Sequence, residues 1–153
     1  MGIKPQFTRD DVRKRYNAFL DEVERMQIET LQELGEKCVT KARSIPSTQG
    51  FQDQTGNLRS SIGYMVFVDG MAIHTMYNPI KEGSQGAKVG ESLAKKIGQG
   101  QQGICLVVTA GMNYALYVES KGRDVLTSAE HLAERELPRM LKELVNDIKR
   151  AAE

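Results

Sequence analysis

Residues 111–126 read GMNYALYVESKGRDVL and join two segments of different character. The apolar run before them, residues 104–108, is typical of a buried strand. The amphipathic stretch after them reaches almost to the C-terminus and predicts a helix. This short connection contains two tyrosines, a carboxylate and a second glycine. A loop that only faced solvent would be more polar. The stretch therefore predicts a connection of defined shape, either a binding site or a joint.

A long helix is predicted near the N-terminus. Thr8 has the character of an N-cap, and the two aspartates close behind it suit the positive end of a helix. Apolar residues then recur every three or four positions as far as Ile45, which is one stripe on a helix. Unbroken to Ala42, the helix would be about 50 Å long at 1.5 Å per residue. Core packing explains such a stripe, and an overhanging end that docks on a neighbouring subunit is the alternative.

The middle of the chain predicts a small sheet. Residues 62–68 and 71–77 have the pattern of strands, and Asp69-Gly70 between them is a strong hairpin signal. Residues 104–108 add a further strand, and apolar positions from Ala129 to Ile148 predict the last helix, with a kink or break at Pro138. The expected fold is α+β over residues 1–153 as a single domain. It has a long N-terminal helix, a mainly antiparallel sheet of three or four strands, and a C-terminal helix packed on the sheet.

The segment at about 80–103 differs from the rest because it holds six glycines and four glutamines. We expect a flexible loop there, although residues 90–97 have the pattern of two helical turns. The segment lacks the Gly-Lys-Ser/Thr ending of a phosphate-binding loop. Its lysines could touch a phosphate backbone, so a small nucleic-acid-binding accessory protein that uses the 81–96 loop is an alternative function. These lysines are Lys81, Lys88, Lys95 and Lys96.

Composition argues against several other classes of protein. The formal net charge is +1, and Lys/Arg and Asp/Glu are balanced in every third of the chain, so nothing favours nucleic acid or an anionic membrane as the main partner. No apolar run approaches the roughly 20 residues that cross a bilayer. Cys38 and Cys105 have no companion ligands at metal-site spacing and are interpreted as buried thiols in a reducing compartment.

Candidate catalytic groups are sparse. His74 and His131 have no carboxylate, cysteine or second histidine at ligand spacing, and Ser60-Ser61 lacks the context of a nucleophilic serine. Glu119 lies near Tyr114 and Tyr117 but has no partner carboxylate. We therefore expect no enzymatic activity and no cofactor, with a hydrolase centred on Glu119 and His74 as a remaining alternative.

Two stretches resemble a known family. Residues 55–62, TGNLRSSI, precede a predicted hairpin, and residues 113–119, NYALYVE, precede Gly122. In this order they resemble the head–tail joining and tail-completion proteins of tailed bacteriophages, which include minor tail proteins of lambda-like siphophages. The family places a long helix before the first motif and a C-terminal helix after the second, as we expect here.

The resemblance implies a structural protein without an active site. Copies would assemble into a hexameric ring at the neck of the virion, between portal or adaptor proteins and tail-tube proteins, after a period in the host cytoplasm. Contact with nucleic acid would be incidental, in the neck channel, and no membrane would be involved. The motif residues would be structural: Thr55, Gly56, Asn57, Leu58, Arg59, Ser61, Tyr114, Ala115, Tyr117, Val118, Glu119 and Gly122.

The resemblance also implies roles for some of these residues. Thr55 and Asn57 would be turn and cap residues. The tyrosines would pack at the joint between the sheet and the last helix, and Glu119 would cap or pair locally. Gly111 and Gly122 would supply positive φ at the two ends of the joint.

Overall fold

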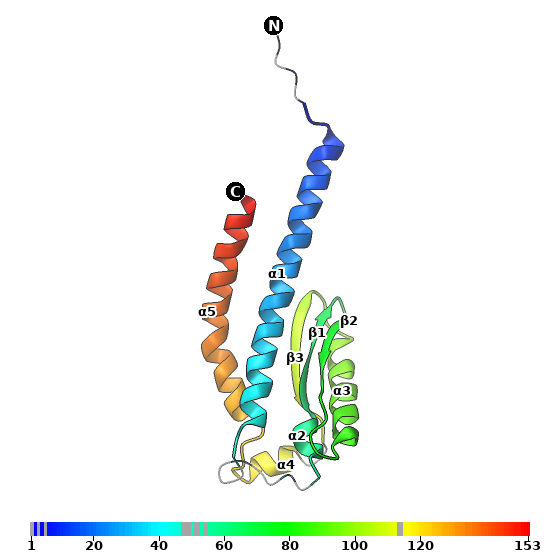
Figure 1. Ribbon diagram of the computed structural model, residues 1–153, viewed down its shortest axis with the longest axis vertical. Coiled ribbons are helices and arrows are strands. Elements are labelled where there is room, and N and C mark those ends of the chain that lie inside the picture. The colour runs from blue at the N-terminus through cyan, green and yellow to red at the C-terminus, as the bar shows by residue number, and fades with distance from the viewer. Residues whose placement is uncertain are drawn as a thin grey trace.

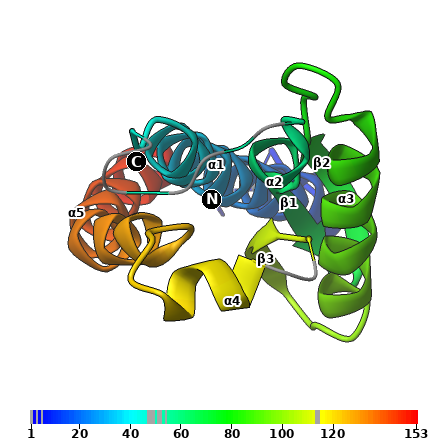
Figure 2. The ribbon, with the colours of Figure 1, turned by 90° about the horizontal axis from the view of Figure 1, so that it is seen from below.

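The computed structural model describes residues 2, 4, 6–46, 50, 53, 55–112 and 115–153, except for the side chain of Tyr117. Helices flank one antiparallel sheet, which confirms the α+β class, and α5, α1, the sheet and α3 follow one another across the molecule (Figure 2). The elements in chain order are α1 (Arg9–Arg43), α2 (Asn57–Ser60), β1 (Ile62–Val68), β2 (Met71–Met76), α3 (Ser84–Gly98), β3 (Ile104–Ala110), α4 (Ala115–Ser120) and α5 (Thr127–Ala152).

Within the described residues the strands form one antiparallel sheet of order β2-β1-β3. Asp69 and Gly70 have φ of 49° and 83°, so the predicted hairpin with two left-handed residues is confirmed. The central strand β1 is buried on both faces. Tyr64 and Val66 pack with the α1 side of the core, while Met65 packs with the α3 side.

Helix α1 begins at the predicted position. The Thr8 hydroxyl accepts a hydrogen bond from the Asp11 amide (3.2 Å), and the Asp11 carboxylate accepts one from the Thr8 amide (2.8 Å). Burial is confined to the C-terminal half of the helix, where a Cβ on Gly35 would come within 2.6 Å of the Tyr64 ring. The N-terminal half projects past the sheet (Figure 1). Gly35 therefore allows close packing of the helix on β1.

Helix α5 lies antiparallel to α1 on the same side of the sheet and packs mainly against α1 (Figure 1). The Cys38 thiol lies 3.7 Å from the Ala129 carbonyl oxygen, near the start of α5. The helix continues through Pro138 without a break. Proline removes one backbone hydrogen bond, and burial of the neighbouring Met140 against α1 offsets that loss.

Helix α3 corrects the prediction of a flexible loop at about 80–103. Residues 84–98 form a helix that covers the second face of the sheet (Figure 2). Its buried side consists of small residues, namely Gly86, Ala87, Gly90, Ala94 and Gly98. A Cβ on Gly98 would lie 2.2 Å from the Phe67 ring, so the glycines allow the helix to approach the sheet closely. The helix therefore packs on the sheet through glycine and alanine positions rather than through large apolar side chains. On its buried side the sequence lacks the row of large apolar residues that usually indicates a helix.

Both cysteines are free thiols, Cys38 buried and Cys105 half-buried. Burial raises the pKa of each thiol above its usual value, which disfavours the reactive thiolate. No helix in the described part of the chain is long and apolar enough to cross a membrane.

Candidate functional site

The first motif, residues 55–62, lies where α1 ends and where β1 and α3 begin. Asp53 shapes the turn, because its two carboxylate oxygens accept hydrogen bonds from the amides of Gly56 (3.0 Å) and Arg59 (2.8 Å). The Thr55 hydroxyl accepts a weaker one from the Asn57 amide (3.3 Å). Gly56 has φ of 83°, and a Cβ there would lie 2.1 Å from the Ile80 carbonyl oxygen. Thr55 is thus a turn residue, and Asp53 is a second one that the motif alone did not reveal.

Two arginines tie the end of α1 to this turn. The Arg59 guanidinium donates to the carbonyl oxygens of Arg43 (2.6 Å) and Ile45 (2.9 Å), where α1 leaves carbonyls without helical partners. The Arg43 guanidinium donates in turn to the Ile62 carbonyl oxygen at the start of β1 (3.0 and 2.7 Å). Burial lowers the pKa of Arg43 from its usual value, but an arginine still keeps its charge.

The remaining polar side chains of the motif reach α3 and the segment before it. Asn57 Oδ1 accepts a hydrogen bond from the Gly86 amide (3.1 Å) and so caps α3. The Ser60 hydroxyl accepts from the Ile80 amide (2.7 Å) and donates to the Ile80 carbonyl oxygen (3.2 Å). The Ser61 hydroxyl donates to the Leu58 carbonyl oxygen at 2.7 Å. Both serines are buried and already bonded, which does not suit a nucleophile.

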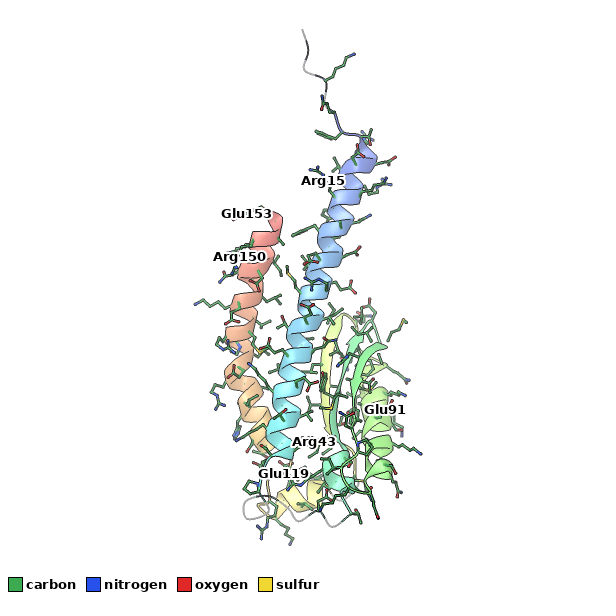
Figure 3. All side chains as sticks on the ribbon, viewed as in Figure 1. Arg15, Arg43, Glu91, Glu119, Arg150 and Glu153 are labelled. Carbon is green, nitrogen blue, oxygen red and sulfur yellow. The ribbon has the colours of Figure 1, made fainter. Side chains whose placement is uncertain are left out.

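Side chains in and just after the second motif form hydrogen bonds with the first turn of α5. One oxygen of Glu119 accepts hydrogen bonds from the amides of Leu126 (3.1 Å) and Thr127 (2.8 Å), and it also bonds the Thr127 hydroxyl. The Asp124 carboxylate accepts from the Ser128 amide (3.2 Å) and bonds the Ser128 hydroxyl. Leu126 at the N-cap of α5 has no side-chain oxygen, so these two carboxylates cap the helix in its place. Figure 3 shows Glu119 at the same end of the molecule as Arg43.

The other residues of this motif are placed as follows. Ala115 is buried and Val118 is half-buried, and both pack with the core cluster that joins α1, the sheet and α5. Gly122 has φ of 78°, in the left-handed region. Gly111 does not have a positive φ, so that prediction is wrong; a Cβ there would instead lie 2.4 Å from the Gly90 Cα, because β3 ends against α3. Asn113 and Tyr114 lie outside the described residues, as does the side chain of Tyr117.

His74 takes part in a separate chain of hydrogen bonds. Its Nε2 lies 2.8 Å from the Tyr64 hydroxyl, which donates to the Glu36 carboxylate at 2.8 Å. Burial, followed by the bond to Glu36, raises the pKa of Tyr64 above its usual value. These contacts join β2, β1 and α1, whereas Glu119 bonds to the start of α5. The structure therefore gives no contact between the two residues of the hydrolase hypothesis, and His131 is exposed on α5.

The described surface has an open, mainly apolar hollow beside the start of α5. The hollow, of about 370 Å³, lies between β3 and α5. Its lining residues are Cys38, Leu106, Val108, Leu126, Ala129, Glu130 and Ala133. Among the described residues, no group of His, Cys, Asp and Glu could hold a metal ion. Comparison with known protein families, with curated proteins and with solved structures finds no match to this chain.

Large apolar side chains are exposed at several other places. They lie just before α1, on the N-terminal part of α1, on α5, on α3, on β2 and on α4: Phe7, Val12, Tyr16, Leu20, Leu141, Val145, Val89, Leu93, Ile97, Met71, Ile73 and Leu116. Two of the four lysines in residues 81–96 contact oxygen atoms of the protein, and the other two are exposed on α3. Lys81 donates to the Asp53 carbonyl oxygen (2.9 Å) and Lys95 pairs with Glu91 (3.2 Å), while Lys88 and Lys96 are exposed on α3.

Proposed function

We propose that this protein is a non-enzymatic structural component of a tailed phage or prophage. It joins head to tail or completes the tail by assembling into a ring at the neck, with portal or adaptor proteins and tail-tube proteins as neighbours. The observation that carries the proposal is the use of the motif side chains. Asn57, Arg59, Ser60 and Glu119 are bonded to other parts of the fold, as expected of a framework and not of a catalytic site.

The arrangement of joints and exposed surfaces supports the same proposal. The two motifs fix the ends of α1, β1, α3 and α5 at one end of the molecule (Figure 1). Most of the exposed large apolar side chains lie away from these joints, on α1, α3, α5 and β2, and Leu116 on α4 is the exception within the second motif. Exposed apolar groups of this kind are typical of surfaces that bind other proteins. A fixed framework with several such surfaces suits a protein that works by contact with its neighbours.

The proposal is tested by adding the purified protein to portal–adaptor complexes from the same phage or prophage. Electron microscopy should show an added ring at the open end of the adaptor. The variant Leu93→Ser, which removes an exposed apolar side chain from α3, reports whether that surface takes part, and Lys88→Ala on the same helix is its control. Failure of the unchanged protein to join these complexes would refute the proposal.

A nucleic-acid-binding accessory protein is the competing proposal. Its support is the exposure of Lys88 and Lys96 on an ordered helix, where cations have fixed positions. Binding to duplex or single-stranded DNA should then weaken steeply as salt rises, and Lys88→Glu together with Lys96→Glu should abolish it. Absence of binding at low salt would remove this competitor.

A further inference from the structure

The N-terminal part of α1 extends past the sheet. Gly35 on α1 lies against the ring of Tyr64 on β1. Strand β1 ends at Val68, four residues after Tyr64, which is about 13 Å further along the strand at 3.3 Å per residue. At 1.5 Å per helical residue that distance brings the end of the sheet level with Met26. Residues 9–26, here named the overhang, therefore lie beyond the sheet (Figure 1). Arg15 lies in this projecting part (Figure 3).

The overhang carries large apolar side chains that are about half exposed. Val12, Tyr16 and Leu20 follow one another at intervals of four and are 53%, 61% and 44% exposed. Helix α5 runs beside the inner part of the overhang. Counting along both helices from the contact between Cys38 and Ala129 places Val145, 48% exposed, level with the inner turns of the overhang. Two adjacent helices thus expose apolar side chains beyond the end of the sheet.

The charges of the overhang are separated along its length. The outer half is mainly basic, with Arg9, Arg13, Lys14 and Arg15 against Asp10 and Asp11, and the inner half carries Asp21, Glu22 and Glu24 before Arg25. An identical helix that docks in parallel would place like charges together. One that docks antiparallel places the basic half of each copy beside the acidic half of the other. The overhang is therefore complementary in charge to a second, antiparallel copy of itself.

We propose that a second copy of this chain docks on the overhang, with the two α1 helices antiparallel about a two-fold axis near residue 18. Tyr16 of one copy then lies against Leu20 of the other, and Arg13 lies against Glu24, each contact occurring twice by symmetry. These residues share one face of α1, since they follow at intervals of three and four. A two-fold contact differs from the head-to-tail contacts that close a ring, so the pairing does not rest on the proposed function.

The size of the overhang sets the strength of the pairing. Eighteen residues span about 27 Å at 1.5 Å per residue, and one helix pair of that length buries less than the roughly 1,200 Å² of a stable interface. We therefore expect a dimer that dissociates in the micromolar range or above. Because ion pairs contribute at the edge of the contact, added salt should weaken it.

Sedimentation equilibrium of the full chain, from low to several hundred micromolar, tests the pairing. The unchanged protein should fit a monomer–dimer equilibrium, and Leu20→Ser should weaken association by about tenfold or more. Arg13→Glu and Glu24→Arg should each weaken it, while the double variant should restore it because the charges are then exchanged on both copies. Lys88→Glu, a charge reversal on exposed α3, is the matched control and should leave association unchanged.

Two results would overturn the inference. A protein that stays monomeric at the highest concentration rejects the overhang as an interface between copies. A double variant as weak as the single ones, with helix content unchanged by circular dichroism, rejects the antiparallel arrangement. The two proposals fail separately, since a monomeric Leu20→Ser variant that still joins portal–adaptor complexes would uphold the neck function, and a dimer that never joins them would refute that function alone.

Discussion

Removing the carboxylate of Glu119 should loosen the start of α5. One oxygen of this side chain accepts hydrogen bonds from the amides of Leu126 and Thr127, which have no helical partners of their own. Hydrogen bonds to a charged group contribute about 1.5–3 kcal/mol, and loss of a helix cap costs about 0.5–2 kcal/mol. Because Asp124 still accepts a hydrogen bond from the next amide, that of Ser128, we expect Glu119→Ala to lower the free energy of unfolding by about 2 kcal/mol.

Urea denaturation followed by circular dichroism measures this change directly. For a domain of this size each kcal/mol corresponds to about 3 °C in Tm, so Glu119→Ala should melt about 6 °C lower. Glu119→Gln keeps an acceptor oxygen but loses the charge, and should lose about half as much. Glu134→Ala, an exposed change on the same helix, is the control and should stay within about 0.5 kcal/mol. If Glu119→Ala is no more harmful than this control, the joint does not depend on Glu119.

Three further changes test other parts of the fold. Gly98→Ala would place a methyl group 2.2 Å from the Phe67 ring and should cost at least about 2 kcal/mol in urea denaturation. Arg59→Met removes two hydrogen bonds to the end of α1 and should cost about 2–3 kcal/mol by the same measurement. Burial raises the pKa of Tyr77 to about 12 in the folded protein. The unfolded phenol ionises near pH 10, so the stability due to the neutral phenol is complete below about pH 10 and is lost as the pH rises to about 12, a loss that Tyr77→Phe should reduce.

The structural features predicted correctly from the sequence are those set by residues close together in the chain. The start of α1 at Thr8 and the hairpin at Asp69-Gly70 are decided within a few positions, and both have local chemical causes. Glu119 was expected to act locally, and it bonds residues only seven and eight positions away. The contacts of Arg43 and Arg59 span fourteen to nineteen positions and depend on the complete fold, so no local pattern could reveal them.

Only two turns of helix α3, at residues 90–97, were expected from the sequence, because glycine can indicate either a mobile segment or close packing. A glycine-rich segment predicts mobility, since glycine weakens a helix by about 1 kcal/mol relative to alanine. Here Gly86, Gly90 and Gly98 recur on one face together with Ala87 and Ala94, and that periodicity was the available sign of a buried helix face. Of the kink or break expected at Pro138, the break does not occur, because local propensity counts for less here than the packing of α5 on α1.

The glycine face of α3 also has a consequence for the order in which parts of the protein form. A helix whose inner side lacks side chains gains little from its own sequence, so α3 should be stable only while the sheet is already in place. We expect its amide hydrogens to exchange with solvent before those of β1, by an opening that leaves the rest of the domain folded. Each such opening would expose Met65 and Phe67, two of the most deeply buried side chains, to solvent for as long as α3 is detached.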